Sequence, residues 1–432
     1  MKFKLTNTKA LQLFHLLRQG SMILTAILLT KSSLSLSDIG AYEMLMYIAY
    51  TLSFWWVSGL VQGLLSKYPT LDASTQKKLI FNAYLLFVGV SLFLFLFLFV
   101  FRSQALTLLV GQSDVRYFSV FLIFMLLNFP AYLLENLLLL EEKPRVILAF
   151  GICSFVGQLV AVILPVYAGW EFYWSFVGLA IFAACKHFWL LVHIWRQGIW
   201  QFRADLIKSW ALRSFPLVLY ALLGGFNMAF DNWLVNYHFG GDEAIFAIFR
   251  YGAQELPLTL ALTNAFSIAV IPEVAQNLNA ALAAIKSKSR KLFHLLFPLS
   301  IILILTDRWL FPFVFNEAFI ASVEIFNIYL LIIISRLVFA RPILIGLQAN
   351  KEVLIISIIE LAVNIIMSFI LVQYFGLIGI AIGTLIAYTL EKTLLCGYLY
   401  VRFGLPVQAY TDLRWFILYT IILIIAFIFS WN

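Results

Sequence analysis

The chain has 432 residues, of which 63% are hydrophobic, 17% are aromatic and only 12% are charged. A soluble domain carries about 45–50% apolar and about 25% charged residues, so this composition excludes an ordinary soluble protein. The formal net charge of +8 could suggest nucleic-acid binding, but the charges lie in short loops between apolar runs. That distribution is typical of an orientation signal in a membrane protein.

Apolar runs of roughly 20 residues recur along the whole chain, and each can cross the ~30 Å hydrocarbon layer as a helix. They predict an all-α polytopic membrane protein rather than a transmembrane β-barrel, whose strands would read as short alternating segments. In chain order we expect thirteen spans at 13–33, 39–65, 79–101, 117–140, 146–168, 172–194, 212–238, 244–271, 292–314, 318–347, 353–375, 377–400 and 414–431. The longest connections are expected near 195–211 and 272–291, and no linker is long enough to hold a soluble domain.

The loops between these spans alternate in positive charge. One side holds Lys2, Lys4, Lys9, Arg18, Lys67, Lys77, Lys78, Lys143, Arg145, Arg196, Arg203, Lys208, Arg213, Lys286, Lys288, Arg290, Lys291, Lys351, Arg402 and Arg414. The other side holds only Lys31, Arg102, Arg116 and Arg308. Because Lys and Arg gather in cytoplasmic loops, the N-terminus is predicted to be cytoplasmic and Asn432 to lie outside.

A weak internal repeat suggests how the spans are organised. The segment "DIGAYEMLMYIAY" at Asp38 resembles "DEAIFAIFRYGAQ" at Asp242, and "LLLLEEKPRVILAF" at Leu137 resembles "LIGLQANKEVLIIS" at Leu344, with nearly equal offsets. A repeat of six spans gives both halves the same orientation, related by an axis along the membrane normal. We therefore predict two six-helix lobes, 1–200 and 201–405, and an additional C-terminal transmembrane helix in 406–432.

Three stretches carry a resemblance to a known family: "FPLVLYALLGGFNMAFDNWLVNYHFGGDEAIFAIFRYGAQELP", "IPEVAQ" and "NKEVLIISIIELAVNIIMSFILVQYFGLIGIAIGTLIAY". In their order and spacing the chain resembles the polysaccharide-export, O-antigen-type flippases of lipid-linked oligosaccharides. These belong to the MATE-like MOP superfamily, together with the MATE exporters and the lipid II flippase. The likeness spans nearly the whole chain, although a thirteenth helix departs from the twelve-helix pattern and some relatives carry fourteen.

The resemblance implies a flippase that moves an undecaprenyl-pyrophosphate-linked oligosaccharide across the bacterial cytoplasmic (inner) membrane. The oligosaccharide would be a repeat unit of O-antigen, capsule or exopolysaccharide, with H⁺ or Na⁺ as the coupling ion. A polysaccharide polymerase and its chain-length machinery would be partners. The sequence has no Walker motif, nucleophile motif or metal-ligand spacing, so we expect no cofactor, metal, nucleic-acid partner or enzymatic activity, and no direct use of ATP.

Cationic residues inside the spans are the candidates for binding substrate. Arg18, Lys186 and Arg250 could line a wet cavity, where a cation lowers the barrier that a pyrophosphate meets in hydrocarbon. Arginine suits this role because its planar fork binds phosphate oxygens bidentately and stays charged. Arg18 lies near the cytoplasmic end of its span and could equally snorkel to the interface, whereas Lys186 lies deeper and is predicted to face the cavity.

Acidic and amide residues inside the spans are the candidates for ion coupling or charge pairing. Asp231 and Arg250 lie at similar depths on either side of a turn at Gly240 and Gly241, so they could form a buried ion pair or face the cavity. Glu360 and Asn364 are four residues apart and share a helix face. They could line the cavity or make a helix–helix hydrogen bond.

Four further charged residues lie near the ends of later spans. Arg336 and Arg341 are expected to snorkel towards the cytoplasm. Glu391 and Lys392 are adjacent in sequence, so they point to different faces, and we expect both at the membrane interface.

Three other functions remain open. A MATE-type multidrug or cation antiporter should depend on a central acid and tolerate loss of Arg250. A membrane polysaccharide polymerase or ligase would present Arg or His in a sizeable outer loop, whereas the outer loops predicted here are short and nearly uncharged. A scaffold protein would have little use for charged residues inside its spans.

Overall fold

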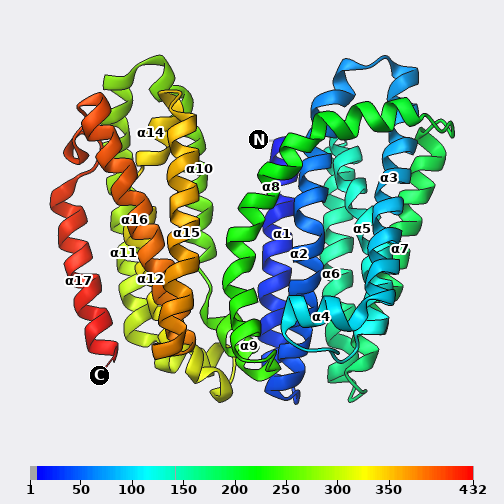
Figure 1. The fold of residues 1–432 in the computed structure, drawn as a ribbon, viewed down its shortest axis with the longest axis horizontal. Helices are drawn as coiled ribbons and strands as arrows, with labels where there is room; N and C mark the ends of the chain where they lie inside the picture. Colours follow the sequence, from blue (N-terminus) through cyan, green and yellow to red (C-terminus); the bar gives the residue numbers. More distant parts are fainter. Residues whose placement is uncertain (1–6, 142, 432) are drawn as a thin grey trace, which may run out of the picture. The chain divides into compact units, whose positions relative to one another are not determined.

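The computed structural model describes residues 7–141 and 143–431, and these ranges contain helices and no β-strand (Figure 1). Thirteen helical segments in the described ranges are long and apolar enough to cross a membrane. The all-α polytopic architecture predicted from the apolar runs is therefore confirmed. The chain divides into two compact units, Met1–Ala247 and Ile248–Asn432, here called unit 1 and unit 2.

Unit 1 is a bundle of long helices with one short helix at an end. Its elements are α1 (Asn7–Thr30), α2 (Leu36–Lys67), the 3₁₀ turn η1 (Tyr68–Thr70), α3 (Ala73–Val100), α4 (Arg102–Val110), α5 (Phe118–Leu140), α6 (Pro144–Tyr167), α7 (Tyr173–Gln197) and α8 (Ala204–His238). Within it α2 packs on α8, α5 on α7 and α1 on α6. The start of α2 is fixed by a capping box, in which Ser35 and Asp38 satisfy each other's backbone N–H groups.

The contact between α2 and α8 is close because small residues line it. A Cβ atom built on Gly59 would lie 2.4 Å from Cα of Val218, and one built on Gly63 would meet the side chain of Ser214. Such small residues let two membrane helices bring their backbones together. The compact unit therefore extends to residue 247, beyond the predicted lobe boundary at residue 200, and the two-lobe division remains a prediction drawn from the repeat.

Unit 2 contains shorter and more interrupted helices. After α9 (Glu243–Gly252), which crosses the division, come α10 (Pro257–Gln276), α11 (Leu278–Val314), η2 (Glu317–Ser322), α12 (Val323–Leu331), α13 (Ile333–Arg336), α14 (Ala340–Gly346), α15 (Asn350–Phe375), α16 (Leu377–Phe403), η3 (Val407–Ala409) and α17 (Leu413–Trp431). The closest pairs are α15 with α16, α11 with α17 and α10 with α14.

Two spans that we expected to be continuous are broken. The span predicted at 244–271 stops at Gly252 and resumes at Pro257, because proline restricts the residue before it and favours the first turn of a new helix. The span predicted at 318–347 is interrupted before α14, whose Pro342 has no N–H to donate to the carbonyl of Val338. Both breaks leave backbone groups that need other partners at membrane depth.

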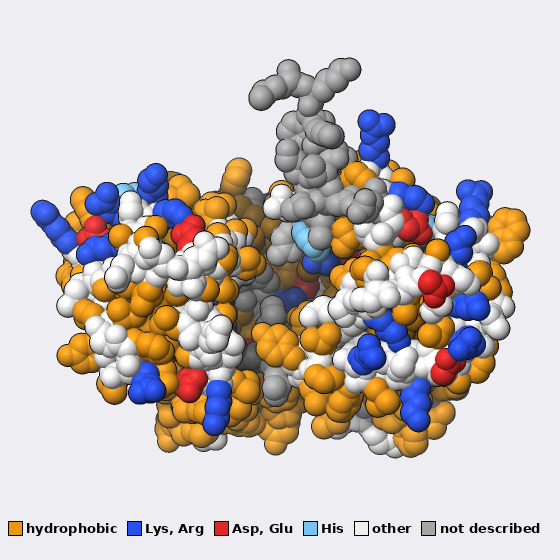
Figure 2. Space-filling view, turned by 90° about the horizontal axis from the view of Figure 1, so that it is seen from above, with side chains coloured by type: hydrophobic (Ala, Val, Ile, Leu, Met, Phe, Trp, Pro, Cys, Tyr) orange, Lys and Arg blue, Asp and Glu red, His pale blue; other side chains and the backbone are white. Residues whose placement is uncertain are grey.

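The predicted connection at 272–291 was also wrong. There α10 runs to Gln276 and α11 begins at Leu278, capped by Asn277, so almost the whole segment is helical. Lys and Arg side chains stand out over the face of the molecule shown in Figure 2. The alternation of loop charge and the cytoplasmic assignment of the basic loops remain predictions.

Candidate transport site

A lysine inside unit 1 is held by a polar contact between two helices. Lys186 lies midway along α7, and its Nζ donates to Oδ1 of Asn128 on α5 at 2.5 Å. The Asn128 amide in turn donates to the hydroxyl of Tyr132 at 3.1 Å, and Lys186 Nζ lies 5.6 Å from the centre of the Phe182 ring. An amine at this depth is costly unless it pairs or meets water. The cavity-facing role of Lys186 stays a prediction.

His187, the neighbour of Lys186, fixes the same helix in place. Its Nδ1 lies 3.0 Å from the carbonyl oxygen of Leu127, and its Nε2 lies 3.1 Å from the hydroxyl of Tyr84. The two adjacent side chains therefore engage α5 and α3 from one turn of α7. This holds the Lys186 ammonium at a defined position.

An acid lies within the electrostatic field of two of the predicted cations. Glu135 is on α5, and the charges of Arg18 on α1 and Lys186 on α7 both act on its carboxylate. Arg18 is exposed on the surface of the protein, so its two predicted roles stay open.

Asp231 and Arg250 lie near the turn that the sequence indicated. Gly240 and Gly241 take positive φ angles of 62° and 75° between α8 and α9, a conformation that favours glycine. Asp231 is 7% exposed on α8, and Arg250 is half-buried in the last turn of α9. The two residues belong to different compact units, so their predicted pairing stays a prediction.

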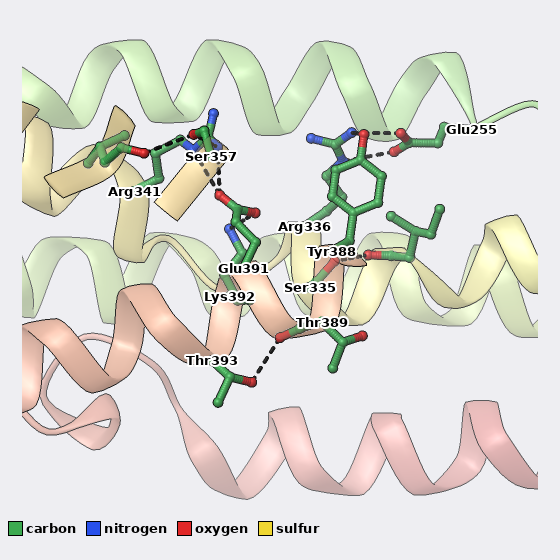
Figure 3. A network of polar contacts seen from close by, with 12 residues as sticks. Glu255, Ser335, Arg336, Arg341, Ser357, Tyr388, Thr389, Glu391, Lys392 and Thr393 are labelled. Carbon is green, nitrogen blue, oxygen red and sulfur yellow. Dashed lines mark hydrogen bonds and ion pairs between the residues drawn. The ribbon is translucent and has the colours of Figure 1, made fainter. Parts of the chain in front are cut away.

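In unit 2, an ion pair joins the two broken spans (Figure 3). Arg336 ends α13, and Glu255 lies in the break before α10. Nε of Arg336 donates to Oε2 of Glu255 at 2.8 Å, and its NH2 donates to Oε1 at 2.6 Å. The guanidinium also lies 4.7 Å from the ring centre of Tyr388. The snorkelling predicted for Arg336 was wrong, because a bidentate carboxylate and an aromatic face hold the guanidinium inside the protein.

A second pair in unit 2 follows the same pattern. Arg341 on α14 donates from Nε and NH2 to Oε1 of Glu391 on α16, at 3.0 and 2.6 Å. Its NH2 also donates to the hydroxyl of Ser357 at 2.9 Å. Glu391 is 3% exposed, whereas the Arg341 side chain keeps 41% of its surface exposed, so the interfacial position of Glu391 and the snorkelling of Arg341 stay predictions. Sequence spacing could not reveal these pairs, because each joins helices far apart in the chain.

Glu360 and Asn364 lie on the buried face of α15. Asn364 accepts hydrogen bonds from the hydroxyls of Ser368 at 3.0 Å and Thr384 at 3.3 Å. Thr384 is on α16, so Asn364 takes part in a helix–helix hydrogen bond, one of its two predicted roles. Glu360, one turn earlier and 5% exposed, remains a candidate for ion coupling.

Arg116, which the sequence indicated only as a loop charge, is the centre of a clasp in unit 1. Arg116 donates to Asp38 at 2.7 Å, to Glu243 at 2.5 Å and to Ser37 at 2.7 Å. The hydrogen bond to Glu243 raises the pKa of Arg116 above its usual value. This clasp, called the outer clasp for its predicted side of the membrane, connects the starts of α2 and α9. The repeat carried a signal for it, because it aligned Asp38 with Asp242, the neighbour of Glu243.

The backbones in the outer clasp also touch. A Cβ atom built on Gly40 would lie 1.8 Å from the carbonyl oxygen of Glu243. Only glycine fits there without moving the start of α9.

Comparison with known proteins gives no sequence match but a clear structural one. No protein-family model matches the chain, and no curated protein sequence matches it. A lipid II flippase, MurJ, in an inward closed conformation superposes with a TM-score of 0.70 over 97% of both chains at 16% identity. An inward-facing multidrug resistance MATE transporter of the MOP superfamily gives 0.64 over 91% of this chain and 95% of that one, at 12% identity. The chain has the fold of these MurJ and MATE structures.

A further MATE multidrug transporter, DinF-BH, gives a TM-score of 0.54 over 90% of this chain and 95% of that chain, at 16% identity. The matched proteins are transporters and flippases rather than enzymes. The fold of this chain is the one that these structures share.

Proposed function

We propose that the protein is a flippase for a lipid-linked oligosaccharide with an anionic linkage to its carrier. The lipid would be undecaprenyl pyrophosphate and the sugar a repeat unit of O-antigen, capsule or exopolysaccharide. The pyrophosphate and sugar would cross through a central cavity by alternating access, while the lipid tail stays in the bilayer. Arg18, Lys186 and Arg250 would bind the pyrophosphate.

The observation that carries this proposal is the amine of Lys186, fixed at mid-helix depth by Asn128. A cation held there attracts a phosphate, whereas it would repel a cationic drug. The likeness to the lipid II flippase over 97% of both chains adds support.

Ion coupling would use a buried carboxylate. Asp231 and Glu360 are 7% and 5% exposed on helices of different compact units, and either could carry H⁺ or take part in binding Na⁺ as the protein changes conformation. Transport into vesicles under an imposed pH or sodium gradient tests this role. A transport rate that is independent of both gradients would exclude this coupling role.

A MATE-type exporter is the second candidate, favoured by the likeness to multidrug transporters. Its cavity would use the acids to bind an organic cation, and Lys186 would weaken that binding. Drug susceptibility of a deletion strain separates the two functions, because a flippase mutant should keep wild-type susceptibility.

The testing experiment is lipid analysis of a deletion strain complemented with variants. Without the protein, lipid-linked oligosaccharide should accumulate on the cytoplasmic side. Wild type and Lys186→Arg should clear it, whereas Lys186→Gln and Arg250→Ala, made at normal levels, should not. Lys288→Gln, which removes an exposed lysine, is the matched control and should behave as wild type. No accumulation, with surface polysaccharide intact, would exclude the flippase function.

A further inference from the structure

Unit 2 contains a cavity of about 620 Å³ that neither transport function uses. It lies beside the C-terminal half of α16. The break before α14, the η3 turn and the start of α17 form its other walls. Residues 389, 392, 393, 396 and 400 line it, and these positions share one face of α16. Its volume is within the roughly 300–1,000 Å³ of small-molecule sites.

The walls of the cavity are apolar and its cationic group is a lysine. Ile334, Val338, Val407 and Phe416 contribute apolar surface, and Lys392 contributes the ammonium. Such a lining suits an amphiphile whose tail covers the walls and whose head group meets the amine. A soluble anion would leave the apolar walls without a partner.

The ammonium of Lys392 has unused hydrogen-bonding capacity. Lys392 makes no hydrogen bond to any residue in the described ranges, and Oε2 of Glu391 is 3.9 Å from its Nζ. The carboxylate of Glu391 is already held by two nitrogens of Arg341 (Figure 3). Three N–H donors on a lysine inside a membrane helix need acceptors, and a phosphate supplies several.

The surrounding charge also favours an anion. The network in Figure 3 contains Arg336, Arg341 and Lys392 against Glu255 and Glu391, which leaves one positive charge in excess. At the rim, Lys286 donates to the backbone oxygen of Gln408 at 2.7 Å and adds another cation. The hydroxyls of Thr389 and Thr393 donate to backbone carbonyls one turn earlier, so they do not compete for the amine.

We propose that this cavity binds an acidic glycerophospholipid of the bilayer, with its phosphate on Lys392 and one acyl chain against α17. Such a bound lipid would join α16 to the η3 turn and to α17, and would stabilise the C-terminal part of unit 2. The proposal does not depend on which transport function is correct.

The test measures the thermal unfolding midpoint of delipidated protein in detergent, titrated with dioleoyl phosphatidylglycerol or dioleoyl phosphatidylcholine. The phosphatidylglycerol should raise the midpoint and the phosphatidylcholine should not. Lys392→Gln should weaken the apparent affinity for phosphatidylglycerol about tenfold, since one charge-assisted contact is lost. Lys392→Arg should retain most of it. Each variant is compared with its own lipid-free midpoint, so a general loss of stability does not mimic the effect.

A second variant blocks the cavity without touching the charge. A Cβ atom on Gly397 would meet nothing within 4 Å, so Gly397→Phe should fill the space and abolish the lipid-dependent shift. Gly89→Phe on α3 of unit 1 is the matched control, because Gly89 is equally open, and it should keep the shift. Equal shifts with both lipids, a shift that survives Lys392→Gln and Gly397→Phe, or protection by undecaprenyl phosphate alone would overturn the proposal.

Discussion

The ion pair between Arg336 and Glu255 should stabilise the two broken spans of unit 2 by a measurable amount. Breaking a buried pair by removing one partner costs about 3–5 kcal/mol. Here Arg336 and Glu255 keep 28% and 15% of their side-chain surface exposed, and the Tyr388 ring would still contact the guanidinium after the carboxylate is lost. Solvent and the ring offset part of the loss, so we expect Glu255→Gln to lower the free energy of unfolding by about 2–3 kcal/mol.

A double-mutant cycle isolates the contribution of the pair. Glu255→Gln, Arg336→Gln and the double variant are unfolded by detergent titration in mixed micelles. The double variant should be less destabilised than the sum of the single ones, with a coupling free energy of about 2 kcal/mol. The exposed pair Lys288–Glu273 in the same unit, 50% and 40% exposed, is the control and should couple by no more than about 1 kcal/mol. Additive effects at Glu255 and Arg336 would refute the reasoning.

Other predictions concern the helices and the clasp of unit 1. Lys186→Gln should reduce transport at least about tenfold, whereas Lys186→Arg should retain most of it, because the positive charge at this position is proposed to bind the substrate phosphate. Transport is measured as clearance of lipid-linked oligosaccharide. Arg116→Gln should speed amide hydrogen exchange at the starts of α2 and α9, whereas Lys31→Gln on the same predicted side should not. Gly40→Ala should lower the thermal midpoint, because its Cβ would meet the carbonyl oxygen of Glu243, whereas Gly89→Ala in open surroundings should leave it unchanged.

Much of the fold follows from local patterns. A run of about 20 apolar residues has one way to satisfy its backbone in hydrocarbon, so the number and order of the spans could be predicted. The breaks were missed because long apolar stretches lie on both sides of them, and Gln254 and Glu255 interrupt the first only briefly. The prolines at positions 257 and 342 were the available signals.

The pairing of charges could not be predicted in the same way. Arg336 and Glu255 are 81 residues apart and Arg341 and Glu391 are 50 apart, so no helical periodicity connects them. Near the end of a span, a snorkelling arginine and a paired arginine give the same local sequence. Lys186 has the polar partner that its depth in the predicted span requires, and its cavity-facing role stays a prediction.

The central claim is that the transported head group is anionic. The most direct measurement is translocation of fluorescent undecaprenyl-pyrophosphate-linked oligosaccharide in proteoliposomes containing the purified protein, with efflux of a cationic dye measured in parallel. The account predicts that the lipid-linked oligosaccharide crosses with wild type and Lys186→Arg, that it does not cross with Lys186→Gln, and that the dye is not transported. Dye efflux that persists in Lys186→Gln, with no movement of the oligosaccharide, would contradict the claim.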